Sequence, residues 1–300
     1  MSTQTIYWHI PGLCYFGLIN QVLLDTMRRY PSHFRDGYKI ASCYGSFPGA
    51  IWNGGRNLFD GFSSKADVER IIAAYNKQGV PARFTWTNVL LEEKHIYDSY
   101  CNMIMRVGDN GMNQVLVNRP VLEEYIRKEY PRYKVLSSTT KRLLNADAIL
   151  EEVKKDYFLV VLDYDLNHNE SVINKLLPVA DKIEILVNET CHPGCARRAN
   201  HYVEISKHQL EFDNRIQFPC SDPTPDKWNF ERVKKLPTFM SNEDIAKYID
   251  MGYRNFKIVG RSGPKQYIID SYLYFLVKDE SRDFIRNILM STISKLSGGK

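Results

Sequence analysis

Three cysteines in the second half of the chain have a spacing that suits metal ligands. Cys191 and Cys195 lie in the segment 188–195, Asn-Glu-Thr-Cys-His-Pro-Gly-Cys, and Cys220 follows in Phe-Pro-Cys-Ser-Asp. The pair comes directly after the apolar run 183–187, which is typical of a buried strand. Thiolates that follow a core strand can converge on one metal centre, and sulfur ligands suit an iron–sulfur cluster or zinc. The sequence therefore predicts a metal site with these three ligands.

Packing in the core is the alternative for Cys191 and Cys195. They are four residues apart, so one helical turn would place both thiols on the same side, as core packing also requires. If they bind a metal, a fourth coordination position remains. His192, His201, Cys43, solvent or substrate could fill it. A closed site would be structural, whereas an open site would be catalytic.

The composition is that of a soluble globular protein with a substantial core. The chain has 300 residues, of which 44% are hydrophobic and 25% charged. A net charge of +5 is compatible with an anionic partner, including nucleic acid, but does not require one. We expect neither a signal peptide nor a membrane span, because no basic, apolar leader and no long apolar run is present. Six irregularly spaced cysteines do not suggest a disulfide framework, so we expect a cytoplasmic protein.

Short β-branched runs alternate with amphipathic stretches along most of the chain. Eight runs have the character of strands: 38–42, 82–86, 114–117, 134–138, 158–162, 182–187, 236–240 and 255–259. The stretches with helical periodicity are 66–77, 95–107, 121–129, 145–155, 170–180, 195–205, 242–251 and 265–289. Eight successive strand–helix units predict an α/β fold, a (β/α)8 TIM-like barrel. An open, doubly wound parallel sheet is the alternative, because the pattern alone does not show closure.

The segment before the first expected strand, residues 1–37, has a helical pattern over 17–29. We expect this N-terminal helical segment to cap the bottom of the barrel. The barrel is then expected over 38–292, with a cysteine-bearing loop at about 206–235. Long loops without secondary structure are usually functional, and binding of Cys220 to a metal would order this one.

Polar residues at the expected C-terminal ends of the strands are the candidates for chemistry, because catalytic groups of such barrels project from these ends. The candidates for proton transfer are Asp163 and Glu189. The candidates for substrate binding are Arg56, Asn88, Arg119, Asn188 and Arg261. A guanidinium group pairs bidentately with carboxylate or phosphate, so the arginines suggest an anionic substrate. Surface charge is the alternative for the arginines, and orientation of a neighbouring side chain is the alternative for Asp163.

The C-terminal part of the chain resembles the collagenase-like peptidase family. The similar segments are 242–261, which ends in Phe-Lys-Ile-Val-Gly-Arg, 267–272, Tyr-Ile-Ile-Asp-Ser-Tyr, and 166–169, Leu-Asn-His-Asn. The resemblance covers about residues 158–275. It implies a TIM-like barrel, and several members of the family are hydroxylases that bind a [4Fe–4S] cluster and act on RNA bases or quinone precursors.

By this resemblance, Cys191, Cys195 and Cys220 would be cluster ligands, and Lys257 and Arg261 would lie at the mouth of the site and take part in catalysis. Two departures from the family pattern concern the site. The family usually supplies four cysteines, whereas three are evident here. Val259 also replaces the glutamate of the family's Lys-Ile-Glu-Gly-Arg segment, so a role of that carboxylate is lost or moved, for example to Glu189.

The sequence leaves three functions open. The first is an iron–sulfur oxidoreductase that hydroxylates or modifies a nucleobase or a small aromatic acid. The second is a zinc-dependent hydrolase on the same barrel, with Glu189 as general base for a metal-bound water. The third is a barrel without catalytic activity that serves as a subunit or nucleic-acid adaptor. The expected partners are an anionic or aromatic substrate, with nucleic acid, a protein partner or a second copy of the chain as further options.

Overall fold

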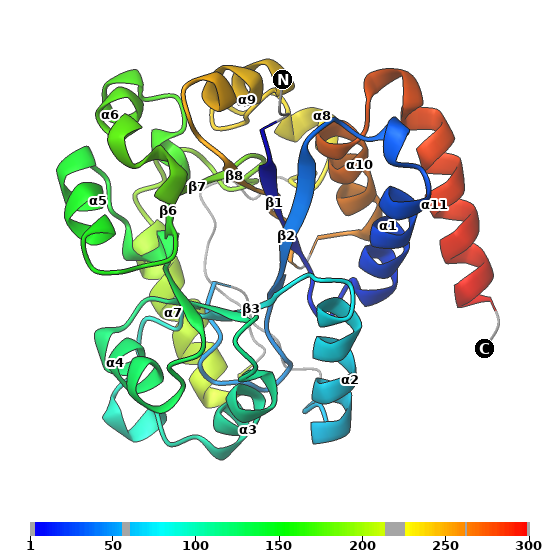
Figure 1. Ribbon diagram of the computed structural model, residues 1–300. Helices are drawn as coiled ribbons and strands as arrows, with labels where there is room; N and C mark the ends of the chain where they lie inside the picture. Colours follow the sequence, from blue (N-terminus) through cyan, green and yellow to red (C-terminus); the bar gives the residue numbers. More distant parts are fainter. Residues whose placement is uncertain (1–3, 56–60, 214–225, 262, 299–300) are drawn as a thin grey trace.

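Eight parallel strands close into a barrel in the computed structural model, which describes residues 4–55, 61–213, 226–261 and 263–298 (Figure 1). Each strand pairs with its neighbours in sequence, and β8 pairs with β1 to close the ring. The strands are β1 (Ile6–Pro11), β2 (Tyr38–Gly45), β3 (Ala82–Trp86), β4 (Gln114–Val117), β5 (Lys134–Ser137), β6 (Val160–Val161), β7 (Ile183–Leu186) and β8 (Asn255–Lys257). The expected barrel is therefore confirmed, and the open sheet is not formed.

Helices surround this ring, as the alternation of strands and helices predicts (Figure 1). In chain order they are α1 (Gly17–Arg29), α2 (Lys65–Asn76), α3 (Ser99–Gly108), α4 (Pro120–Glu129), α5 (Ala146–Val153), α6 (Glu170–Lys175), α7 (Arg198–Glu211), α8 (Phe230–Val233), α9 (Asn242–Asp250), α10 (Lys265–Leu276) and α11 (Arg282–Ser297). No helix in the described part of the chain is long and apolar enough to cross a membrane.

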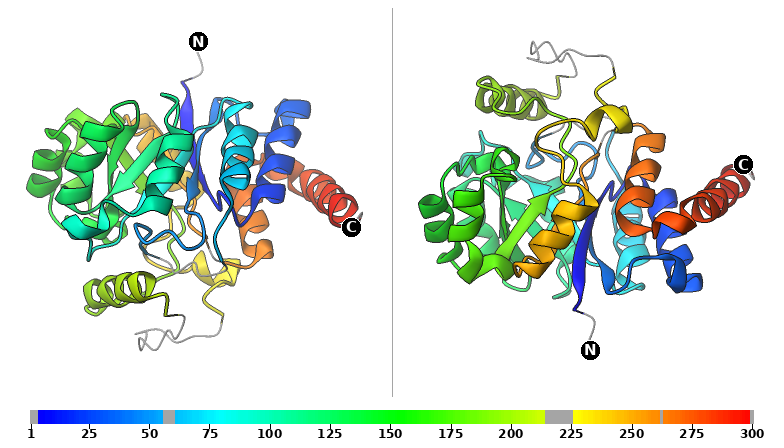
Figure 2. Two further views of the ribbon diagram at one scale, coloured as in Figure 1. Left: turned by 90° about the horizontal axis from the view of Figure 1, so that it is seen from below. Right: turned by 90° about the horizontal axis from the view of Figure 1, so that it is seen from above.

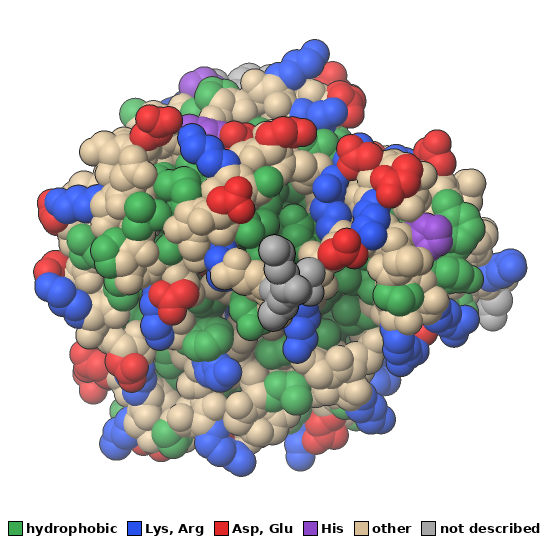
Figure 3. All heavy atoms as spheres, turned by 45° about the horizontal axis from the view of Figure 1, so that its top comes forward, with side chains coloured by type: hydrophobic (Ala, Val, Ile, Leu, Met, Phe, Trp, Pro, Cys, Tyr) green, Lys and Arg blue, Asp and Glu red, His purple; other side chains and the backbone are tan. Residues whose placement is uncertain are grey.

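The two ends of the barrel differ. Helix α7 lies over the C-terminal ends of the strands, and the N-terminus of the chain lies at the opposite end (Figure 2). Figure 3 shows the N-terminal end obliquely, with hydrophobic side chains towards its middle and side chains of both charges around them. The C-terminal end is therefore covered by a helix, whereas the N-terminal end is open.

The N-terminal segment differs from the expected cap. Residues Ile6–Pro11 form β1, which is hydrogen-bonded between β2 and β8, and Gly17–Arg29 is the first outer helix. The barrel thus begins at residue 6 and not at residue 38. Nearly every residue of β1 is buried, and its Trp8 packs against the rings of Tyr38, Phe256 and Phe275. A strand that is buried on both faces lacks the alternating pattern that would have revealed it.

The expected strand 236–240 is not formed. Its Met240 amide donates to the carbonyl of Val187, so the segment runs beside the end of β7 without forming a ladder. Pro237, the second residue of the segment, lacks the amide that a ladder requires. The expected helix 265–289 is in fact two helices, because Val277 is extended and forms an isolated bridge with Phe34.

A buried asparagine joins α1 to the barrel. Asn20 donates to the carbonyl of Pro11 at 3.0 Å and to the hydroxyl of Tyr75 at 3.2 Å. Its carbonyl accepts from the hydroxyl of Tyr272 at 2.7 Å. One fully buried side chain therefore connects β1, α1, α2 and α10.

The Asn20→Ala substitution should lower the free energy of unfolding by about 3 kcal/mol, because it leaves several buried polar groups without a partner. Urea titration of the full chain measures this. The matched control is Leu18→Ala on the same helix, where the side chain is 39% exposed and the loss should stay within about 1 kcal/mol. Equal losses in both variants would contradict this role of Asn20.

Candidate functional site

A charged cluster fills the middle of the barrel. The Glu184 carboxylate on β7 accepts a hydrogen bond from Arg83 Nη1 on β3 at 2.5 Å and lies 3.3 Å from Lys257 Nζ on β8. His9 on β1 approaches the same carboxylate at 3.3 Å and contacts Arg83 Nη2 at 2.8 Å. Gln114 on β4 accepts a hydrogen bond from Arg83 Nε. Five strands thus supply one network, which we call the ionic layer.

Burial and mutual charge set the protonation states in the ionic layer. Burial alone would raise the pKa of Glu184, but Arg83 and Lys257 outweigh it and hold this pKa well below its usual range. Burial and Arg83 lower the pKa of His9 to about 3, so the imidazole is neutral at neutral pH. Burial lowers the pKa of Lys257 to about 8, despite the opposing effect of Glu184. The layer therefore holds two cations against one carboxylate, and one of its cations can release a proton near neutral pH.

A small cavity of about 70 Å³ lies above the ionic layer, at the C-terminal mouth of the barrel. Its polar lining comes from strand ends, from the segment after β5 and from α7: Tyr44, Thr85, Thr87, Ser138, Thr139, Thr140, Glu189, Tyr202, Lys257 and Arg261. Lys257 Nζ lies 4.2 Å from the centre of the Tyr44 ring. The cavity has room for a few water molecules only. The structure thus brings together Lys257, Glu189 and Arg261, three residues that were selected from the sequence.

Arg261 spans the mouth. Its guanidinium donates to Thr85 Oγ1 at 2.7 Å and to the carbonyl of Gly54 at 3.1 Å. A Cβ at Gly54 would lie 2.3 Å from the backbone of Thr87, and a Cβ at Gly55 would lie 2.6 Å from Arg261 Nη2. The Gly54-Gly55 turn therefore permits the close approach of this loop to the arginine.

Hydrogen bonds hold α7 over the mouth. Asn88 donates to the carbonyls of Ile51 and Ser206, and the Val89 amide donates to Ser206 Oγ at 3.0 Å. Gln209, also on α7, donates to the carbonyl of Ala50. Both amide hydrogen bonds of Asn88 are thus made to the protein backbone, and its predicted part in substrate binding stays a prediction.

An ion-pair network holds the start of α7. Arg198 lies 3.2 Å from Asp163 and 3.0 Å from Asp165, and its guanidinium stacks on the Tyr164 ring at 3.8 Å. Arg142 contacts Asp163 from the other side at 2.9 Å. Burial raises the pKa of Asp163, and the two arginines offset this only in part. Asp163 is not among the residues that line the cavity, and its contacts orient Arg198.

The segment 187–197, which carries Cys191 and Cys195 and which we call the cysteine loop, connects β7 to α7. Its Gly194 amide donates to Asp165, and Glu189 accepts hydrogen bonds from the amides of Thr190 and Cys191. Cys191 is half-buried and packs against an apolar cluster inside the mouth that includes Leu186 and Val259. Two members of this cluster, Leu186 and Val259, also line the cavity, as does Glu189.

Two of the three predicted metal ligands lie within the described residues. Cys191 and Cys195 are both half-buried on the cysteine loop, and a Cβ at Gly194 between them would meet open space. Cys220, the third predicted ligand, lies outside the described residues. Within residues 4–55, 61–213, 226–261 and 263–298, no group of three histidine, cysteine or acidic side chains is placed to hold a metal ion.

The other predicted substrate-binding residues have different surroundings. Asn188 is buried, donates to Tyr267 and to the carbonyl of Val259, and accepts from the Val259 amide at 2.6 Å. These contacts join the end of β7 to the end of β8. Arg119 is exposed and donates to the carbonyl of Leu91. Arg56 lies outside the described residues.

The ionic layer was not predicted from the sequence. Arg83 and Glu184 are charged residues within short buried strands, and such a charge must be paired. A charged residue inside an apolar run is therefore a signal that could have revealed it. Tyr202 was missed for another reason, since nothing in its local sequence shows that α7 folds over the barrel mouth.

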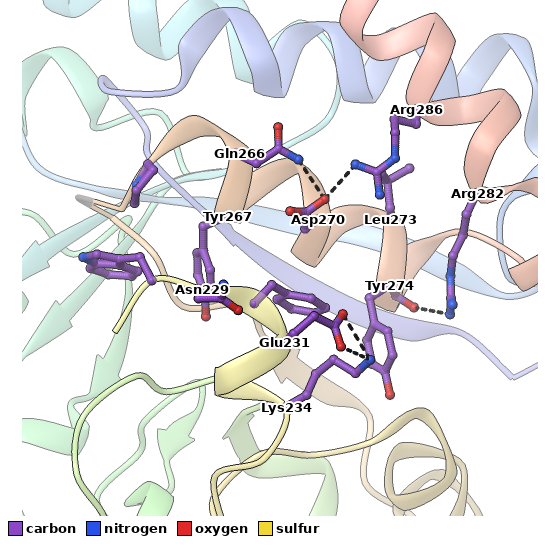
Figure 4. Close-up of a pocket in the computed structure, with 13 residues that line it drawn as sticks. Asn229, Glu231, Lys234, Gln266, Tyr267, Asp270, Leu273, Tyr274, Arg282 and Arg286 are labelled. Carbon is purple, nitrogen blue, oxygen red and sulfur yellow. Dashed lines mark hydrogen bonds and ion pairs between the residues drawn. The ribbon is translucent and has the colours of Figure 1, made fainter. Parts of the chain in front are cut away.

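A second hollow of about 370 Å³ lies outside the barrel between α8, α10 and α11 (Figure 4). Its charged side chains already interact with one another: Lys234 with Glu231 at 3.0 Å, and Arg286 with Asp270 at 2.8 Å. Gln266 donates to the same Asp270 carboxylate. These charged groups are therefore already paired with one another and are not available to a charged ligand.

Comparison with known proteins supports the fold. No protein-family model matches this sequence, and no match was found among curated proteins. Among solved structures, that of a U32 peptidase is similar, with a TM-score of 0.55 and 13% sequence identity over 88% of this chain and 96% of that chain. The chain thus has the barrel fold of a U32 peptidase, and U32 is the collagenase-like peptidase family that the C-terminal sequence resembles. At this identity the similarity shows the fold and not the reaction.

The Lys257→Met substitution should change how stability depends on pH. With a pKa of about 8 in the folded protein and about 10.4 unfolded, Lys257 binds fewer protons when folded between these values. The stability of the wild type relative to the variant should therefore rise by about 3 kcal/mol across this window. Urea titrations at several pH values measure it. The exposed Lys235→Met is the control, and a difference that stays constant with pH would contradict the assignment.

The Arg198→Met substitution should release the start of α7. The buried Asp163 and the partly buried Asp165 would each lose a partner, which weakens the docking of the helix by about 3 kcal/mol. Hydrogen exchange should become faster at the amides of 198–209. Lys207→Met, at an exposed position of α7, should leave exchange unchanged. Unaltered exchange in Arg198→Met would show that the helix is held by other contacts.

Proposed function

We propose that this protein is an iron–sulfur-dependent oxidoreductase that acts on a small anionic or aromatic substrate at the C-terminal mouth of the barrel. The observation that carries the proposal is the position of Cys191. Cys191 packs against an apolar cluster that includes Leu186 and Val259, and its amide donates to Glu189, which lines the same cavity as Lys257 and Arg261. In this proposal, the predicted cluster ligands and the predicted substrate-binding groups would belong to one site.

Cys191, Cys195 and Cys220 would hold the cluster, which when bound supplies electron transfer. Arg261 extends across the mouth and would bind the anionic group of a substrate through its guanidinium. Lys257 Nζ, with a pKa of about 8, would hold or deliver a proton near neutral pH. Helix α7, with Tyr202 at the cavity, would exclude water once it has closed.

The resemblance to the collagenase-like peptidase family supports a nucleobase or a small aromatic acid as substrate, and hydroxylation as one type of modification. The similar solved structure is that of a protein named as a peptidase. The polar and aromatic lining of the mouth, with Tyr44 and Tyr202 beside Lys257, supports an aromatic substrate over a peptide chain.

Metal analysis tests this proposal. The full chain, purified without oxygen, should contain iron and acid-labile sulfide and should be brown. Cys191→Ser should lose most of the iron, the sulfide and the colour, because a cluster ligand is removed. Cys101→Ala is the matched control: Cys101 is buried in α3, outside the cysteine loop, and the variant should keep the cluster.

Other outcomes would replace the proposal. Stoichiometric zinc without sulfide would instead support the hydrolase, with Glu189 as base for a bound water. Absence of any metal would support the adaptor. Colour that survives in Cys191→Ser would contradict the ligand assignment.

A further inference from the structure

The N-terminal end of the barrel holds a cavity of about 480 Å³. It lies at the end opposite α7, which Figure 3 shows obliquely. Small-molecule sites usually measure about 300–1,000 Å³. The N-terminal face of such barrels normally serves stability, so an open cavity of this size calls for another explanation.

Cationic side chains dominate its rim. Lys39, Lys134, Lys182 and Arg254 line the cavity, together with a single carboxylate, Asp181. All three lysines are exposed, and across the described stretches of the chain none of them forms an ion pair. We call this cavity the basic funnel. Unlike the hollow in Figure 4, it presents ammonium groups that are available to an anion.

The floor of the basic funnel is polar and lies on the ionic layer. His9, Gln114 and Asn255 line it, and each is more than nine-tenths buried. Gln114 binds Arg83 through its carbonyl oxygen, and among the described residues no group accepts a hydrogen bond from its amide nitrogen. Because His9 is neutral, the ionic layer next to this floor carries two cations and one carboxylate. This excess positive charge adds to the positive potential inside the basic funnel.

Apolar surface completes the walls. Tyr7 and Phe158 are each 38% exposed, and Ile40, Pro81 and Leu159 lie between the rim and the floor. Lys134 Nζ lies 4.5 Å from the centre of the Phe158 ring, which places a cation beside an exposed aromatic face. A ligand that suits this lining has a flat ring and an anionic group.

We propose that the basic funnel binds a nucleoside phosphate. The rim lysines would bind the phosphate, Tyr7 and Phe158 would pack against the base, and the Gln114 amide would donate to an acceptor on the base edge. This site is separate from the C-terminal mouth and does not depend on a metal centre.

Calorimetric titration of the full chain with ADP tests the proposal. ADP should bind, and the double variant Lys39→Gln/Lys182→Gln should weaken binding at least about tenfold, because two phosphate contacts are lost. The matched control Lys207→Gln/Lys235→Gln makes the same charge change at exposed positions away from the funnel and should leave the affinity unchanged. The lysines of both pairs are exposed, so all four substitutions should leave the fold intact.

Two further arms separate the contributions to binding. Phe158→Ser should weaken the binding of ADP but not of inorganic phosphate, because only the base contacts the ring. Arg261→Gln should leave ADP binding unchanged, since Arg261 lies at the other mouth. The proposal is overturned if ADP does not bind, if the rim and control pairs have equal effects, or if Arg261→Gln abolishes binding. Binding of a single-stranded oligonucleotide without binding of ADP would also overturn it.

Discussion

Inside the barrel, the buried carboxylate of Glu184 determines which side chains must lie beside it. A buried charge must be paired, and Glu184 is fully buried between Arg83 and Lys257. Removing Glu184 would leave two buried cations without a counter-charge in the barrel interior. The arrangement ties β3, β7 and β8 together across the barrel. Burial in this layer also lowers the pKa of Lys257 to about 8, so its ammonium group can release a proton at the C-terminal mouth.

The ionic layer lies between the C-terminal mouth of the barrel and the basic funnel at its N-terminal end. Above it, α7 and the cysteine loop close a small polar cavity, held by the contacts of Arg198 with Asp163 and Asp165. Below it, the basic funnel is open and its rim lysines are exposed. One buried network thus forms the floor of both. The covered end has the features of a reaction site, and the open end those of a binding site.

The barrel could be predicted because alternating short strands and amphipathic helices are a local property of the sequence. Seven of its strands overlap the expected ranges, whereas β1 was missed because a strand buried on both faces has no alternation. Lys257, Glu189 and Arg261 could be selected from strand ends and the family resemblance. The role of α7 could not, because the contact of Asn88 with Ser206 joins residues that are 118 positions apart. The same holds for the funnel, whose lysines lie far apart in the sequence.

The position of the metal centre is the central claim of this account. An anomalous difference map at the iron absorption edge, from crystals of the full chain grown without oxygen, tests it most directly. The account predicts an iron peak within bonding distance of the sulfur atoms of Cys191 and Cys195, at the edge of the cavity lined by Lys257 and Arg261. A map without an iron peak at this loop, or with iron bound elsewhere in the protein, would contradict it.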